Sequence, residues 1–189
     1  LIGLVGSEMC IRDSHKAVRR VMNLLAPLLT LETVRLNLDV VSRKRLYEEA
    51  GLVFETSAGL SHTEAFDALF AREKLGSTCL GSGCALPHGR VEGITEPAAV
   101  FLRTAAPLSL DAPDGRPVQL FLCLLIPEND DGMYLKILRE AACLFGNKPL
   151  TNALLHAEPE VKICELIHNW TPPADLHYEP DFSEDDEDA

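Results

Sequence analysis

The most reactive feature of the sequence is a histidine held between a proline and a glycine. Pro87 restricts the backbone before His88, and Gly89 leaves little bulk beside the ring. An imidazole with an unperturbed pKa of about 6.5 is mostly neutral at pH 7, and it then carries a free nitrogen lone pair. His88 is therefore a candidate nucleophile.

The residues around this histidine favour an anion as its reaction partner. Residues 76–83 are rich in glycine and small hydroxyl side chains. Such a segment can bend sharply, and its backbone N–H groups can form an anion-binding concavity. Arg72 and Arg90 would add positive charge. The combination predicts the handling of a phosphoryl group. The candidate cradle residues are Ser77, Thr78, Gly81, Gly83, Gly89 and Arg90.

A metal site is the alternative use of the same segment. Cys79, Cys84 and His88 have C-x4-C-x3-H spacing, which supplies three zinc-type ligands. A fourth ligand is missing and the glycines already have a use, so we expect neither a metal nor a cofactor. The cysteines form no C-x-x-C set and suit reduced thiols in a cytosol. Three lie in apolar patterns and are expected to be small buried hydrophobes: Cys123, Cys143 and Cys164.

The elements that must position these residues alternate between helices and strands. Ser42 is expected to cap a helix to about Ser57, and Ser61 and Glu64 have capping-box spacing for a second helix to about Lys74. Residues 98–102 and 118–126 favour strands, and the second run is apolar enough for a central strand. Further helices are expected near 132–145, 150–156 and 160–169. This alternation predicts an α/β fold.

Composition bounds the remaining possibilities. Residues Gly3 to Ser14 can be read codon for codon as a translation of a common sequencing adapter, with a natural leader as the alternative. We therefore exclude residues 1–14 from the fold and expect the natural start at Met22 or upstream of the recorded sequence. The net charge is −12, but eight acids fall in the last fifteen residues, so residues 171–189 are expected to form an acidic disordered tail. No basic face supports nucleic-acid binding. No apolar run approaches the ~18 residues that membrane insertion requires.

The run from Arg72 to Arg90 resembles a known signature. Enzyme IIA domains of the fructose/mannitol type belong to the bacterial phosphoenolpyruvate-dependent phosphotransferase system. Their nitrogen-regulatory branch usually carries R-E-x-x-G-S-T-G-x-G-x-G-x-A-x-P-H-G-K. Here Cys79 replaces a glycine, and Arg90 stands where lysine is common. The similarity extends from about Leu25 to Trp170.

The resemblance implies one domain at residues 25–170, with a mixed β-sheet sandwiched between helices and the His88 loop at its edge. It implies that His88 accepts phosphate from a histidine-containing phosphocarrier protein in the cytoplasm. Such a relay needs a neutral, uncapped ring that a docking protein can reach. Arg72 matches the phosphoryl-binding cation of the family, with an ordinary helix-end salt bridge as the alternative.

One position departs from the family pattern. A second histidine usually follows the loop after the central strand, and the equivalent position here is Tyr134. A phenol can donate a hydrogen bond, but with a pKa of about 10 it exchanges its proton poorly at neutral pH. We expect slower phosphotransfer or a changed phosphohistidine lifetime.

Three functions fit the sequence. The favoured one is a regulatory phosphocarrier whose partners respond to the phosphorylation state of His88. The second is a sugar-transport IIA component that passes phosphate to a fructose- or mannitol-type IIB domain. The third is a binding module with weakened phosphotransfer, which Tyr134 and Cys79 motivate.

Overall fold

The computed structural model describes residues 23–176. The adapter-like residues 1–14, Met22 and residues 177–189 of the predicted tail lie outside the described residues. In the described part, no helix is long and apolar enough to cross a membrane.

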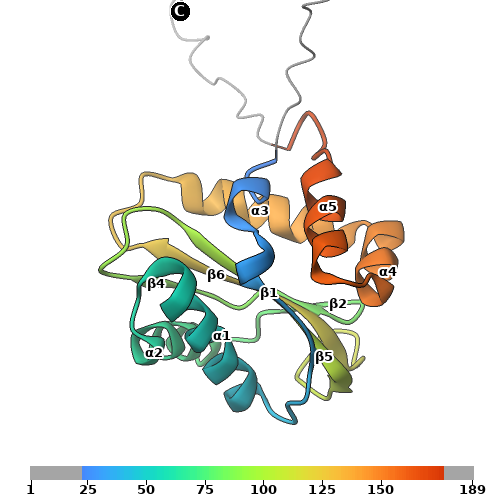
Figure 1. Cartoon of the computed structure of the whole chain (residues 1–189), viewed down its shortest axis with the longest axis horizontal. Helices are drawn as coiled ribbons and strands as arrows, with labels where there is room; N and C mark the ends of the chain where they lie inside the picture. Colours follow the sequence, from blue (N-terminus) through green and yellow to red (C-terminus); the bar gives the residue numbers. More distant parts are fainter. Residues whose placement is uncertain (1–22, 177–189) are drawn as a thin grey trace, which may run out of the picture.

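A mixed sheet of six strands forms the centre of the described chain (Figure 1). Its order is β1-β5-β6-β3-β2, and β4 pairs with β6 beyond the end of β3. Strands β5 and β6 are antiparallel, whereas β1 runs parallel to β5, and β3 and β4 run parallel to β6. The strands are β1 (Val34–Leu38), β2 (Cys79–Gly81), β3 (Cys84–Ala85), β4 (His88–Val91), β5 (Ala98–Leu108) and β6 (Val118–Pro127).

Helices cover both faces of this sheet, as predicted (Figure 1). The hairpin of α1 and α2 covers one face, and α3, α4 and α5 cover the other together with two short 3-10 turns. The α/β/α sandwich expected from the sequence is therefore confirmed. The helices are α1 (Arg43–Ala58), α2 (His62–Glu73), α3 (Met133–Gly146), α4 (Lys148–His156) and α5 (Glu160–Asn169), with the turns η1 (Ala26–Leu28) and η2 (Leu31–Thr33).

Strand β6 separates two hydrophobic cores. Its side chains alternate, so that Leu122 and Leu124 face α3–α5 while Phe121 and Cys123 face α1 and α2. The unbroken apolar run of β6 is thus explained by burial on both faces, and its predicted central position is confirmed. Of the other two cysteines predicted to be buried, Cys164 is buried as expected, whereas Cys143 is only half-buried and belongs to neither core.

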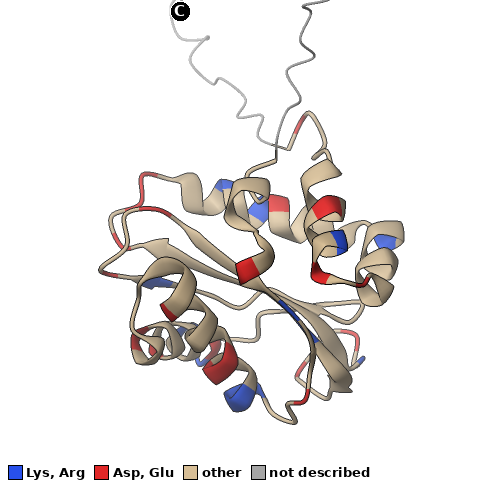
Figure 2. Ribbon diagram, viewed as in Figure 1, with Lys and Arg blue, Asp and Glu red and all other residues tan. Residues whose placement is uncertain are grey.

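Helix α1 begins as the sequence predicts. The Ser42 hydroxyl accepts the N–H of Arg45 at 3.2 Å, which satisfies one free donor of the first turn. Two of the three cationic residues there pair within the chain, since Arg45 pairs with Glu48 and Arg43 reaches Glu73 on α2. Acidic and basic positions are interspersed along the ribbon (Figure 2).

The capping box predicted for α2 is wrong. Ser61 makes no side-chain cap bond, and Glu55 of α1 instead accepts the N–H of His62 at 2.8 Å. This contact is available because the two helices pack closely: a Cβ on Gly51 would lie only 2.6 Å from the His62 carbonyl oxygen. Glu55 accepts hydrogen bonds from the backbone and the side chain of His62. Both lower the pKa of the Glu55 carboxyl, and the backbone bond has the larger effect.

Helix α2 packs just as closely on β4, and this contact holds the candidate site. A Cβ on Gly89 would lie 2.7 Å from the Ala68 carbonyl oxygen and 3.2 Å from the Ala68 Cβ. Only glycine therefore permits the observed distance between the helix and the strand.

Substituting Gly89 tests this constraint. We expect Gly89→Ala to lower the free energy of unfolding by about 1–3 kcal/mol, because helix backbone must move to admit the methyl group. Urea unfolding followed by circular dichroism measures the change. Gly146→Ala is the matched control, since its Cβ would meet no atom within 4 Å. Equal stability of the two variants would contradict the packing argument.

Candidate active site at His88

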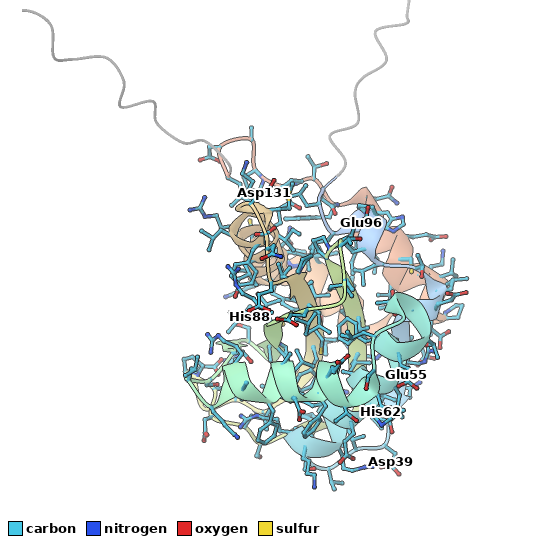
Figure 3. The ribbon with its side chains drawn as sticks, turned by 90° about the vertical axis from the view of Figure 1, so that its left-hand side faces the viewer. Asp39, Glu55, His62, His88, Glu96 and Asp131 are labelled. Carbon is cyan, nitrogen blue, oxygen red and sulfur yellow. The ribbon has the colours of Figure 1, made fainter. Side chains whose placement is uncertain are left out.

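His88 is the first residue of β4, where it pairs with Leu124 of the central strand β6. The sequence placed it in a loop; the structure places it in a short strand at the edge of the sheet, because the extended Pro87–His88 backbone continues into sheet pairing. His88 is buried, with only 8% of the residue exposed. In the side view of Figure 3, His88 lies between helix α2 and the loop that carries Asp131.

Two hydrogen bonds fix the tautomer of this ring. Nδ1 lies 2.7 Å from the Leu86 carbonyl oxygen, which can only accept, so Nδ1 carries the proton. Nε2 lies 3.1 Å from Nε of Arg72, which can only donate, so Nε2 carries the lone pair. The ring is therefore neutral, with Nε2 as its nucleophilic atom.

The environment of His88 also keeps the ring neutral. Burial lowers its pKa, and the Arg72 guanidinium lowers it further, while the bond to Leu86 and the Glu73 carboxylate act in the opposite direction. The net shift is downward. The expectation of an uncapped ring is wrong, however, because Arg72 occupies Nε2 in the resting protein.

Arg72 comes from the end of α2 and bridges two parts of the site. Its Nε donates to His88, and its Nη1 donates to the Gly76 carbonyl oxygen at 2.9 Å. Within residues 23–176, no carboxylate lies at ion-pair distance from this guanidinium, so the alternative of a helix-end salt bridge is not what the geometry shows. The guanidinium N–H groups that these two bonds leave free can donate to an anion that reaches Nε2.

Tyr134, from the first turn of α3, lies against both His88 and Arg90. The His88 and Tyr134 ring centroids are 5.9 Å apart, and the Arg90 guanidinium carbon lies 4.8 Å from the Tyr134 centroid. Asp130 accepts the Tyr134 backbone N–H at 2.8 Å and fixes this turn. Burial raises the pKa of Tyr134 despite the two nearby arginines, so the phenol stays protonated.

The predicted cradle residues divide into two groups. Ser77 is exposed beside Gly76, Gly89 follows His88 in β4, and Arg90 reaches the site through Tyr134. Thr78 is buried, and its hydroxyl donates to Glu73 at 2.6 Å.

Gly81 and Gly83 lie elsewhere. Both have positive φ in the hairpin between β2 and β3, where Asp114 accepts the Ser82 N–H at 2.8 Å. Along β6, Cys84 at the end of this hairpin pairs with Leu120, whereas His88 pairs with Leu124. Four strand residues span about 13 Å, so the structure does not bring this hairpin to the histidine. The glycines serve the turn.

The metal alternative has no geometric support. Cys84 is buried in the core beneath α3–α5, whereas Cys79 is buried in the core beneath α1 and α2. In the described chain, no three potential ligands gather to hold a metal ion.

Sequence reasoning missed one residue of the site. Glu73 matches the R-E dipeptide, but the sequence predicts no role for it. The structure gives its carboxylate four polar contacts, with Arg43, Tyr47 and both polar groups of Thr78. The sequence does contain a signal for this role: a carboxylate at an expected helix end, with a threonine five residues later.

Known proteins share both the sequence pattern and the fold. Residues 27–170 match the family described as phosphoenolpyruvate-dependent sugar phosphotransferase system, EIIA 2. A nitrogen regulatory protein of Pseudomonas aeruginosa is 34% identical over 144 residues, which cover 76% of this chain and 94% of the relative.

Two crystal structures extend the comparison. Nitrogen regulatory protein IIA-Ntr from Neisseria meningitidis is 43% identical, with a TM-score of 0.73 over 77% of this chain and 99% of that one. The IIA mannitol structure from Escherichia coli, at 19% identity, shares the fold, with a TM-score of 0.63 over 74% of this chain and 98% of that one. The chain belongs to the EIIA type 2 family of the phosphoenolpyruvate-dependent phosphotransferase system.

Proposed function

We propose that this protein is a regulatory phosphocarrier, and that His88 accepts a phosphoryl group at Nε2 from a histidine-phosphorylated carrier protein. The observation that supports this most directly is the pair of hydrogen bonds that leaves the lone pair on Nε2 and places a guanidinium beside it. Similarity to proteins named nitrogen regulatory protein favours regulation over sugar transport.

The transfer can be written without a cofactor. The Nε2 lone pair forms the new P–N bond, while the P–N bond to the donor ring breaks and its electron pair returns to the donor nitrogen. His88 keeps its Nδ1 proton, so its ring gains the positive charge that the donor ring loses. No proton exchange with solvent is required.

Arg72 would change partners during this step. Its Nε–H now occupies the lone pair on Nε2, which the incoming phosphorus must use. Turning toward the phosphoryl oxygens would free Nε2 and let the guanidinium offset their charge. Arg72 is half-exposed, so this rearrangement needs no change in the core.

The direct test is labelling by phosphoenolpyruvate, enzyme I and carrier protein, with the phosphorylated residue mapped under conditions that preserve phosphohistidine. We expect His88→Ala to remove all label, because no other imidazole in residues 23–176 has this setting. His62→Ala is the control, since His62 is exposed and pairs with Glu55. Equal labelling of wild type and His88→Ala would contradict the proposal. Onward transfer to an added IIB domain would favour sugar transport instead.

Removing the guanidinium should slow transfer and shift its pH dependence. We expect Arg72→Gln to lower the rate constant of transfer by about 10²-fold through loss of charge stabilisation. The acceptor is the neutral ring, so the rate falls as pH drops through the His88 pKa. Burial and Arg72 lower that pKa, so losing the cation raises it and moves the acid limb to higher pH.

Rates measured between pH 5 and 8, with NMR titration of the His88 ring, check this shift. Arg45→Gln on the exposed face of α1 is the matched control. An acid limb that stays in place in Arg72→Gln would show that the guanidinium does not act on the ring.

The residue at position 134 should tune the rate. We expect Tyr134→His to raise the transfer rate severalfold, because an imidazole can be protonated near neutral pH and add positive charge beside the phosphoryl oxygens, whereas the half-buried phenol stays neutral. Tyr134→Phe is the control, since it keeps a ring beneath Arg90 and removes only the hydroxyl. Single-turnover phosphorylation measures the rate, and a Tyr134→His rate equal to that of wild type would contradict the expectation.

A further inference from the structure

Glu73 is a buried carboxylate that directly follows Arg72 at the end of α2. Its side chain is 6% exposed. One oxygen, Oε2, accepts the hydroxyl of Thr78 at 2.6 Å and that of Tyr47 at 2.9 Å. The other, Oε1, lies 3.4 Å from both the Thr78 N–H and the Arg43 guanidinium. Residues of α1 and of the connection between α2 and β2 therefore meet at one acid of α2.

The groups that donate hydrogen bonds to Glu73 keep their protons at neutral pH. Burial, and then the charge of Glu73, raise the pKa of Tyr47 well above its ordinary value, so its phenol keeps its proton. Arginine remains charged at all accessible pH values. The site around Glu73 thus consists of groups that donate throughout the neutral range.

A line of hydrogen bonds leads from Glu73 to the reactive ring. Glu73 holds Thr78 through its hydroxyl and its N–H. The Thr78 carbonyl oxygen accepts the Leu86 N–H at 3.0 Å, and the Leu86 carbonyl oxygen accepts Nδ1–H of His88 at 2.7 Å. The orientation of His88 therefore depends on where Glu73 holds the segment around Thr78.

Charge gives Glu73 a second connection to the reaction. When Nε2 forms its bond to phosphorus, the ring keeps its Nδ1 proton and becomes positive. The Glu73 carboxylate favours a positive His88 ring, while the Arg72 guanidinium opposes it. The two neighbours in sequence thus act on opposite charges of the product, Arg72 on the phosphoryl oxygens and Glu73 on the imidazolium.

We propose that Glu73 is a positioning residue for phosphoryl transfer at His88, which holds the Nδ1 side of the ring through Thr78 and Leu86 and offsets the positive charge that the ring acquires. The inference rests on the proposed function, and it assigns to Glu73 a part in the transfer step beyond the stability of the fold.

The experiment compares full-length wild type, Glu73→Gln and the control Glu55→Gln, an exposed acid remote from the site. Phosphorylation by phosphoenolpyruvate, enzyme I and carrier protein is followed in single turnover, and the His88 pKa is measured by NMR. We expect Glu73→Gln to slow phosphorylation about tenfold and to lower the His88 pKa, since the charge that raises it is gone. Glu55→Gln should match wild type.

The pKa is the readout that a purely structural role would not move. The charged or titratable groups facing His88 are Arg72 and Glu73 from α2 and Tyr134 from α3, with Arg90 above the Tyr134 ring, while the residue opposite in β6 is the apolar Leu124. Glu73→Gln changes only one of these groups. Thr78→Val keeps the carboxylate, so it should slow transfer with a smaller change in the pKa.

Each outcome decides between the proposals. Without label on wild-type His88, the proposed function itself fails. If wild type is labelled and Glu73→Gln shows the same rate and the same His88 pKa, the role of Glu73 is refuted and the proposed function stands. If Glu73→Gln loses cooperative unfolding, Tyr47→Phe and Thr78→Val replace it, and wild-type rates in both of these folded variants refute the inference.

Discussion

The bond between Nδ1 of His88 and the Leu86 carbonyl oxygen is the constraint on which the chemistry of this fold depends. A carbonyl can only accept, so this contact places the proton on Nδ1 and the lone pair on Nε2. Strand β4 then holds the backbone of His88 against the central strand, while the close contact of Gly89 with α2 sets where Arg72 can reach. Fold and reactivity therefore meet in a few residues around position 88.

The sequence predicted the larger elements because each carries its own signal. The apolar run of β6 required burial on both faces, and Ser42 indicated the start of α1. Strand β1 was missed, although Val34–Leu38 alternates apolar and polar residues. The three short strands β2, β3 and β4 have little pattern of their own, since they exist only through pairing with β6 and with one another.

At the site, local sequence predicted residue types better than their partners. The helix end carrying Arg72 and the strand carrying His88 lie sixteen residues apart, and their contact follows from packing of α2 on β4. The glycine-rich segment was over-interpreted, because positive φ at Gly81 and Gly83 serves a hairpin turn as well as an anion cradle. Likewise, the cap of α2 comes from Glu55, a residue that no local motif would select.

The paired charges Arg72 and Glu73 show why a helix end suits this site. Consecutive residues on a helix point about 100° apart, so one helix end can present a cation to His88 and a carboxylate to Thr78 at the same time. Moving α2 relative to β4 would shift both charged groups together. The close packing at Gly89 therefore fixes the positions of both groups relative to His88. In the proposed transfer, a cation that turns toward the phosphoryl oxygens is useful only if the His88 ring stays fixed, and holding that ring is the role we propose for the buried Glu73 carboxylate.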